Sequence, residues 1–168
     1  DQVKGVEKDG KICLSACVTN VGERAGKEVV QAYAQAPQGK LGKPARTLVS
    51  FVKTRLLAPG ETQTVFLSFA VDSLASYDDL GKVAKSAYVC EAGGYHFHLG
   101  NSVRDTVEVP FVHTEPADRV VQQLTQRVAP VALPERMLAD GSYEALPVIP
   151  GGEKDRNPAF VEGLQPHK

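Results

Sequence analysis

The chain has 168 residues, of which 42% are hydrophobic and 23% charged, and its formal net charge is -1 at pH 7. This composition is ordinary for a globular protein, and a chain of this length can bury a core without disulfide staples. The sequence has no basic stripe and no apolar run near the roughly 20 residues that span a bilayer, so we expect neither a nucleic-acid partner nor a membrane partner. Because it begins Asp1-Gln2-Val3 without an initiator methionine, we interpret it as a piece of a longer polypeptide.

The three cysteines, Cys13, Cys17 and Cys90, predict free thiols rather than a disulfide framework. Cys13 and Cys17 are four residues apart in a predicted strand, which separates them by roughly 13 Å, too far for a bridge. Unpaired thiols are typical of a reducing compartment, so a cytoplasmic location is expected. A zinc site needs a fourth soft ligand at the right spacing, and none is evident.

Alternation of apolar and polar residues with a period of two predicts about seven short strands. They cover residues 11–19, 28–34, 47–52, 62–69, 86–91, 95–99 and 106–112. Ala92-Gly93-Gly94 predicts a hairpin between the fifth and sixth of these, and Asp72 is expected to cap a short helical turn over residues 72–77. Short strands with turns about every 8–12 residues are typical of an immunoglobulin-like β-sandwich.

The last third of the chain breaks this pattern and predicts a helical and extended tail. Pro116 suits the first position of a helix, and Val120, Leu124 and Val128 recur at the spacing of an amphipathic helix. A second short segment is expected over residues 134–138, and the Pro- and Gly-rich stretch after Pro147 is typical of a linker or arm. We therefore divide the chain into an all-β sandwich over residues 1–112 and a helical connector with an extended arm over residues 113–168.

The apolar stripe of this tail predicts a docking surface. Val120, Leu124 and Val128 have no place in a seven-stranded core, so we expect them to pack on the sandwich or on a partner domain. A second candidate is the face of the strand that Cys13, Ser15 and Cys17 share, because an uncharged face packs against a partner with little desolvation cost.

A search for catalytic residues identifies none. His96 and His98 share one strand face, but they supply only two ligands, so we expect no metal and no cofactor. Asp78 and Asp79 are adjacent and would face opposite ways in a strand, whereas a glycosidase needs two carboxyl groups that face one sugar. We expect these aspartates to serve turns and caps. The sequence also has no nucleophile elbow and no phosphate-binding loop.

Sugar binding is the alternative function, because carbohydrate surfaces stack sugars on exposed aromatic rings. The chain has no Trp, five Tyr and six Phe. Most of these aromatic residues lie in predicted strands and are expected in the core, including Tyr33, Phe66 and Phe97. Tyr77 and Tyr143 remain as candidate substrate-binding residues.

A series of motifs, matched in order over residues 14–105, resembles the fibronectin type III-like domain of glycoside hydrolase family 3. The matching segments are Val18-Thr19-Asn20-Val21-Gly22, Ala25-Gly26-Lys27-Glu28-Val29-Val30-Gln31-Ala32-Tyr33, Lys43-Pro44, Leu48-Val49-Ser50-Phe51-Val52-Lys53-Thr54, Leu57-Ala58-Pro59-Gly60-Glu61, Leu74-Ala75-Ser76-Tyr77-Asp78, Gly94-Tyr95 and Leu99-Gly100-Asn101-Ser102. Many members have a Trp after the Ser-Tyr-Asp segment, whereas this chain continues Asp79-Leu80-Gly81. In this it is similar to the branch in which the sandwich precedes the catalytic barrel.

The tail segments Leu133-Pro134-Glu135-Arg136-Met137 and Asp140-Gly141-Ser142-Tyr143-Glu144 resemble the connector toward that barrel. The resemblance implies a parent β-glucosidase or related exo-glycosidase whose nucleophile and acid/base lie on other domains. No catalytic residue can be carried over to this chain, so we expect that it is not an enzyme by itself. Our leading hypothesis is a non-catalytic accessory domain that stabilises or docks the catalytic domains and shapes the rim of the sugar pocket. The alternatives are a carbohydrate-binding module and the small subunit of a split glycosidase, so the expected partners are the catalytic domains or a carbohydrate.

Overall fold

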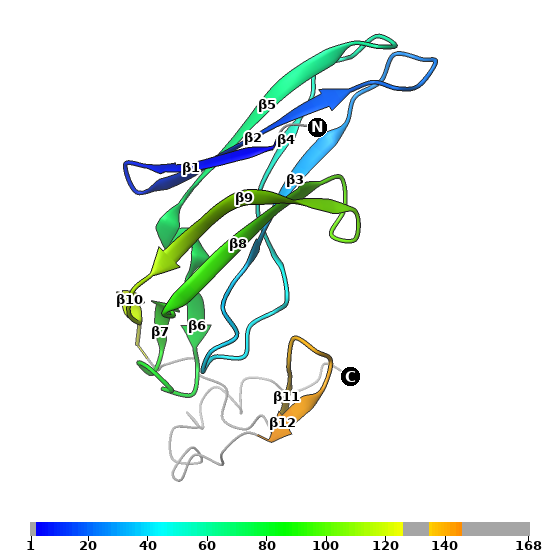
Figure 1. Cartoon of the computed structure of the whole chain (residues 1–168). Helices are drawn as coiled ribbons and strands as arrows, with labels where there is room; N and C mark the ends of the chain where they lie inside the picture. The colour runs from blue at the N-terminus through cyan, green and yellow to red at the C-terminus, as the bar shows by residue number, and fades with distance from the viewer. Residues whose placement is uncertain (1–2, 126–134, 146–168) are drawn as a thin grey trace, which may run out of the picture.

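The computed structural model describes residues 3–125 and 135–145, and within them the fold is almost entirely β (Figure 1). The strands are β1 (Lys4–Lys8), β2 (Lys11–Thr19), β3 (Val29–Gln35), β4 (Thr47–Lys53), β5 (Thr62–Ala70), β6 (Ser76–Asp78), β7 (Ala87–Cys90), β8 (Gly93–Gly100), β9 (Thr106–Glu115), β10 (Arg119–Gln123), β11 (Glu135–Met137) and β12 (Tyr143–Ala145). A 3-10 turn, η1 (Val71–Leu74), follows β5. In the described part, no helix is long and apolar enough to cross a membrane.

Two antiparallel sheets face each other and form the sandwich. One has the strand order β1-β2-β5 and the other β4-β3-β8-β9. Strands β1 and β9 lie beside each other along one side, and β4 and β5 along the other. A smaller sheet, β10-β7-β6, extends one end of the sandwich, and the β11-β12 hairpin lies beyond that end (Figure 1). The structure thus confirms an all-β, fibronectin III-like sandwich.

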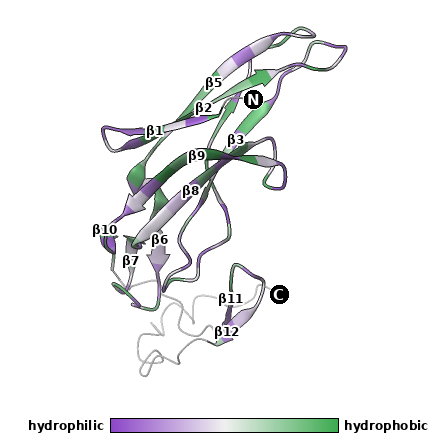
Figure 2. Ribbon diagram, viewed as in Figure 1, coloured by the Kyte–Doolittle hydropathy of each residue, from purple (hydrophilic) through white to green (hydrophobic). Residues whose placement is uncertain are grey.

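The core fills the space between the two large sheets because alternate side chains of each strand point inward. From β2 these are Ile12, Leu14 and Ala16, which are at most 7% exposed. Opposite them lie the inward residues of β3 and β8, and the Phe69 and Phe97 rings approach to 5.7 Å between centroids. Figure 2 shows strands that are mostly apolar or mixed and connecting loops that are mostly hydrophilic.

Strand β1 lies outside the seven predicted strands. It pairs with β2 across Asp9-Gly10, and both residues have positive φ, 52° and 69°. This is the conformation that a two-residue hairpin turn of type I′ requires, and Asp-Gly is a preferred sequence for it. The dipeptide was therefore a usable signal for the hairpin.

The predicted hairpin across Ala92-Gly93-Gly94 is wrong. Strand β7 pairs with β6 and β10, whereas β8 pairs with β3 and β9, so the chain crosses from one sheet to another at this point. The crossing buries Glu91, which is 2% exposed. The predicted cap is also wrong, because Ala70 is the N-cap of η1 and Asp72 instead binds Arg119 at 2.8 Å.

The helical tail is the largest error of the sequence analysis. Strand β9 continues to Glu115, past the predicted boundary at residue 112, and residues 119–123 form β10 rather than a helix. β10 pairs antiparallel with β7, so tertiary pairing with a strand edge overrides a weak local pattern. A spacing of four could not separate the alternatives, because residues four apart also share a face of a regular strand.

The segment expected over residues 134–138 is a strand as well. Glu135–Met137 pairs with Tyr143–Ala145 in the β11-β12 hairpin. The turn contains Asp140-Gly141, with Gly141 at φ 85°, and Leu138 N donates to Ser142 O at 2.8 Å. Val128 and the predicted arm after Pro147 lie outside the described residues.

The three cysteines are free thiols, as predicted. Cys13 and Cys17 are partly exposed on β2, whereas Cys90 is fully buried, and burial raises its pKa to about 11. Because the thiolate is the reactive form, we expect two thiols to react with a disulfide reagent in the native chain and the third only after unfolding. Peptide mass mapping of the labelled protein checks this. Native labelling of Cys90 at the rate of Cys13 would contradict the buried position.

Candidate docking site

Three segments meet at the end of the sandwich near the β11-β12 hairpin. They are residues 36–46 between β3 and β4, residues 79–86 between β6 and β7, and the hairpin itself, and together we call them the loop end. These segments are far apart in sequence and lie side by side in Figure 1. Loops held by a rigid scaffold are where binding surfaces are commonly found. The side chains that fix this end therefore define the candidate site.

Glu91 holds the first loop. Its carboxylate lies 2.6 Å from the ammonium of Lys43, and both side chains are at most 3% exposed. This contact is an ion pair without regular hydrogen-bond geometry. The carboxylate also accepts the backbone N–H groups of Lys40 and Leu41, the latter at 3.3 Å. A side chain at Gly39 would place its Cβ 2.5 Å from Glu91 Oε1, so this close approach requires glycine.

Tyr95 completes the surroundings of this ion pair. Its hydroxyl donates to the Glu91 carbonyl at 3.0 Å, and the Lys43 ammonium lies 5.8 Å from the centre of its ring. A buried charge is tolerated only when it is paired with an opposite charge and its remaining hydrogen-bonding groups have partners. The loop over residues 36–46 is therefore fixed to the sandwich by a charge pair rather than by apolar packing alone.

Asp78 holds the second loop. Its carboxylate is 1% exposed and accepts four backbone N–H groups, from Gly81, Lys82, Val83 and Ala84, at 2.7–3.0 Å. Burial raises the pKa of this carboxyl, but the four donors outweigh burial and hold the pKa below its usual range. The sequence analysis expected Asp78 in a turn or cap, and this is confirmed.

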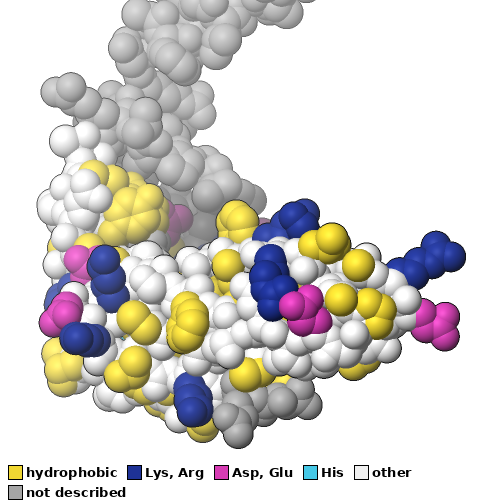
Figure 3. Space-filling view, turned by 90° about the horizontal axis from the view of Figure 1, so that it is seen from above, with side chains coloured by type: hydrophobic (Ala, Val, Ile, Leu, Met, Phe, Trp, Pro, Cys, Tyr) yellow, Lys and Arg dark blue, Asp and Glu magenta, His cyan; other side chains and the backbone are white. Residues whose placement is uncertain are grey.

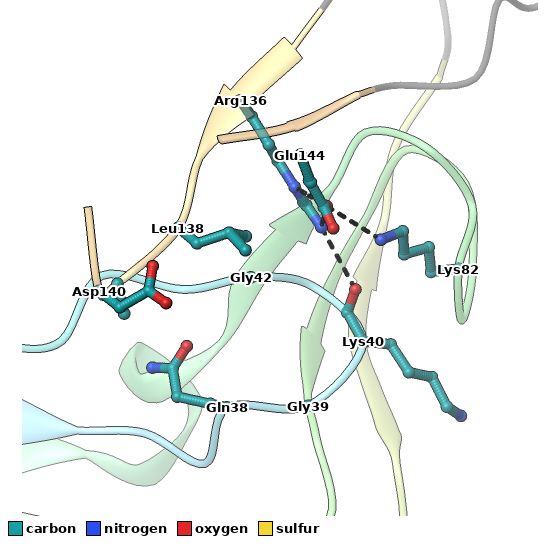
Figure 4. Close-up of a pocket in the computed structure, with 10 residues that line it drawn as sticks. Gln38, Gly39, Lys40, Gly42, Lys82, Arg136, Leu138, Asp140 and Glu144 are labelled. Carbon is teal, nitrogen blue, oxygen red and sulfur yellow. Dashed lines mark hydrogen bonds and ion pairs between the residues drawn. The ribbon is translucent and has the colours of Figure 1, made fainter. Parts of the chain in front are cut away.

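Arg136 and Glu144 attach the hairpin to the two loops. The Arg136 guanidinium pairs with Glu144 on the neighbouring strand and donates to the carbonyl oxygen of Lys40 (Figure 4). It also donates to the carbonyl oxygen of Leu41. Lys82 reaches Glu144 from the second loop at 3.2 Å. Hydrogen bonds from Arg136 and then Lys82 hold the pKa of Glu144 below its usual range.

An open cleft of about 640 Å³ lies between the hairpin and the first loop. Carbon atoms make up the larger part of its exposed lining, although many of the lining side chains are polar or charged: Gln38, Gly39, Lys40, Gly42, Lys82, Arg136, Leu138, Ala139, Asp140 and Glu144. The carboxylate of Glu144 is paired with Arg136 and Lys82, and that of Asp140 accepts the Ser142 hydroxyl at 2.6 Å. The cleft therefore offers both apolar surface and polar groups to a neighbouring surface or ligand.

The predicted docking residues are exposed but do not form the expected stripe. The exposed fractions of Val120 and Leu124 are 45% and 38%, and a bulge between Val120 and Gln122 breaks the register. Val121, which was not predicted, packs against the main core.

The candidate sugar-binding residues lie on different sheets. Tyr77 is on β6, where its ring lies 5.5 Å from that of Tyr88. Tyr143 is on β12, opposite Met137, and is 63% exposed.

The two histidines share a sheet face, as expected, but each has a separate partner. His96 Nδ1 lies 2.9 Å from Glu108, and His98 Nε2 lies 3.1 Å from the Gln35 amide oxygen. Among residues 3–125 and 135–145, no group of three or more His, Cys, Asp or Glu side chains is arranged to hold a metal ion.

Sequence reasoning missed the residues that build the loop end. Lys43, Glu91 and Arg136 stand apart in the sequence, and no spacing rule connects them. One signal was available: Asp140-Gly141 between two short runs is typical of a hairpin turn. It would have placed Arg136 and Glu144 on paired strands.

Comparison with known proteins agrees with this fold. Residues 28–103 match the family described as fibronectin type III-like domain. The chain is 53% identical over 136 residues to β-glucosidase A of Butyrivibrio fibrisolvens, which covers 81% of this chain and 16% of that protein. A β-glucosidase of Ruminococcus albus is 42% identical over 162 residues, covering 94% of this chain and 17% of that protein. The crystal structure of a β-glucosidase from Paenibacillus barengoltzii superposes with a TM-score of 0.72 at 42% identity, over 87% of this chain and 17% of that one.

The fold and the family match together define a fibronectin type III-like β-sandwich. The proteins that it resembles over most of its length are β-glucosidases, and it spans only 16–17% of the curated relatives named above. The chain belongs to the fibronectin type III-like domains of the family 3 β-glucosidases, in which such a domain is a non-catalytic accessory.

Proposed function

We propose that this chain docks through its loop end on the catalytic domains of the same polypeptide, stabilises them and borders their sugar pocket. The parent protein is then a β-glucosidase. The observation that supports this is that contacts of Glu91, Asp78 and Arg136 hold the loop end in place within this chain, before any partner binds. A surface that is already ordered loses little conformational entropy when a partner binds it.

The test is Arg136→Ala in the complete parent polypeptide. Arg136 joins the hairpin to the first loop, so its loss loosens the proposed contact surface. We expect the half-time of heat inactivation to fall several-fold, while kcat and KM at low temperature stay unchanged.

The matched control is Arg55→Ala, which removes an ion pair with Glu61 that lies between β4 and β5 and is 54% and 35% exposed. Exposed pairs of this kind contribute about 0–1 kcal/mol. Equal inactivation rates for the two variants would show that the loop end does not support the catalytic domains.

Carbohydrate binding by this domain is the second candidate function. The observation that favours it is the exposed ring of Tyr143 beside Glu144, a residue that lines the cleft. Titration of the chain with β-linked gluco-oligosaccharides tests it. Binding that Tyr143→Ala abolishes and Tyr77→Ala leaves intact would support this function, and an absence of binding would exclude it.

A further inference from the structure

The outer surface of the β1-β2-β5 sheet has no role in the proposed function. We call it the β2 face, after its central strand. Its residues are the outward members of the three strands in register: Lys4, Val6, Lys8, Lys11, Cys13, Ser15, Cys17, Thr19, Thr62, Thr64, Phe66, Ser68 and Ala70. Phe66 lies opposite Ser15 and is 74% exposed, although the sequence analysis expected it in the core.

Charge is distributed unevenly on the β2 face. Its centre is neutral, and its only charged residues are three lysines, Lys4, Lys8 and Lys11, on β1 and at the start of β2. Among the described residues, no ion pair involves these lysines. The neighbouring acids lie off this face, because Glu7 contacts His113 at 2.7 Å and Asp9 lies in the turn.

The outer surface of the opposite sheet differs from this one. There the polar side chains are engaged with one another, as in the His96–Glu108 pair and the bond from Arg46 to Thr106 at 2.9 Å. The β2 face has only two side-chain hydrogen bonds within the described residues, Thr19 to Thr62 at 2.8 Å and the long contact of Cys17 with Thr64 at 3.5 Å. Its groups are therefore available to a partner.

A neutral centre with an aromatic side chain and a charged margin is the usual composition of a protein interface. Seen from above, the molecule has separate apolar patches with Lys and Arg side chains between them rather than one large apolar area (Figure 3). The β2 face, with its neutral centre and its three lysines, calls for a partner with acidic groups and a local apolar depression, because like charges placed opposite the lysines would repel them.

We infer that the β2 face is a second docking surface for the catalytic part of the same polypeptide, where Phe66 enters an apolar depression and the three lysines face acidic groups. The inference rests on the proposed function, since it assigns a further contact to the same partner. The occupant is the remaining length of the parent, because the chain spans only 16–17% of the relatives it matches.

The test measures binding of this chain to the separately produced remainder of the parent polypeptide. We expect Phe66→Asp to raise Kd at least about tenfold, as for an aromatic residue at the centre of an interface. The matched control is Phe51→Asp, because Phe51 is 69% exposed on the opposite sheet and its replacement should leave Kd unchanged. Both variants should unfold at the temperature of the unmodified chain. Cys13 and Cys17 should be protected from thiol reagents in the complex and reactive in the free chain.

The outcomes separate this inference from the function on which it rests. If the unmodified chain binds and Phe66→Asp binds equally well with Cys13 and Cys17 still reactive, the β2 face is not an interface and the loop end remains the contact. If the chain instead forms dimers that Phe66→Asp dissociates, the occupant is a second copy and the inference is wrong. If the unmodified chain does not bind the remainder at all, both proposals fail.

Discussion

Replacement of Glu91 by glutamine is expected to lower the free energy of unfolding by about 3–5 kcal/mol, because it leaves the Lys43 ammonium buried without a counter-charge. Both side chains of this pair are at most 3% exposed, so water cannot compensate. Glutamine has nearly the same shape, so the loss reports the missing charge and the backbone N–H that the amide NH₂ group cannot accept, rather than packing. Urea unfolding of the two proteins at neutral pH measures the difference.

Two further variants make this result specific. Lys40→Met removes an ion pair with Asp118 in which the lysine side chain is 59% exposed, and it should leave the stability close to that of the unmodified chain because water screens such a pair. The double variant Glu91→Gln with Lys43→Met removes both buried charges and should recover most of the lost stability. A loss below about 1 kcal/mol for Glu91→Gln, or no recovery in the double variant, would show that the pair does not hold the loop.

Asp78→Asn is expected to destabilise the chain by about 2–4 kcal/mol at neutral pH, because charged acceptors form the stronger hydrogen bonds. The carboxylate accepts four N–H groups, whereas an amide oxygen accepts fewer and its NH₂ would face donors. Loss of these bonds should also increase hydrogen exchange over residues 79–86. Hydrogen-exchange mass spectrometry, with the β2 core as internal reference, follows the loop directly.

The pH dependence of Asp78 has a definite sign. Its pKa is lower in the folded chain than in the unfolded chain, where it is about 3.9. The ionised Asp78 carboxylate therefore contributes its full stabilisation at pH values above the unfolded pKa. This stabilisation is lost as the pH falls through the lower pKa of the folded chain. Glu115, Asp118 and Glu144 also have lowered pKa values, so the difference between wild type and Asp78→Asn is the relevant quantity. A difference that does not shrink below about pH 4 would contradict an ionised Asp78.

The sandwich could be predicted because a half-buried strand alternates apolar and polar residues with a period of two, and this alternation is visible in the sequence. In β5, Val65, Leu67 and Phe69 are buried while the residues between them are not, as the alternation predicts. The tail could not be predicted in this way, because β10 depends on the unpaired edge of β7 rather than on its own residues. Val120 and Val121 are β-branched and suit a strand, but the helical spacing of Val120 and Leu124 favoured the other interpretation.

The loop end shows a different limit of sequence reasoning. Glu91 and Lys43 lie 48 positions apart, and their pairing exists only because the chain changes sheets between β7 and β8. Phe66 shows the same limit on the outer surface. Its alternation with Val65 and Leu67 placed it on the outward side, yet its aromatic character favoured the core. The expectation that Phe66 lies in the core is wrong, because its place in the alternation puts its side chain on the outward side of β5.

The central claim is that this domain stabilises the catalytic part of its own polypeptide by docking on it. The most direct measurement adds this chain to the separately produced remainder of the parent and records complex formation by calorimetry together with the temperature of inactivation. Docking predicts a one-to-one complex and a higher inactivation temperature than that of the remainder alone. The claim would be contradicted if no complex formed and the remainder alone were as heat-stable as the complete polypeptide.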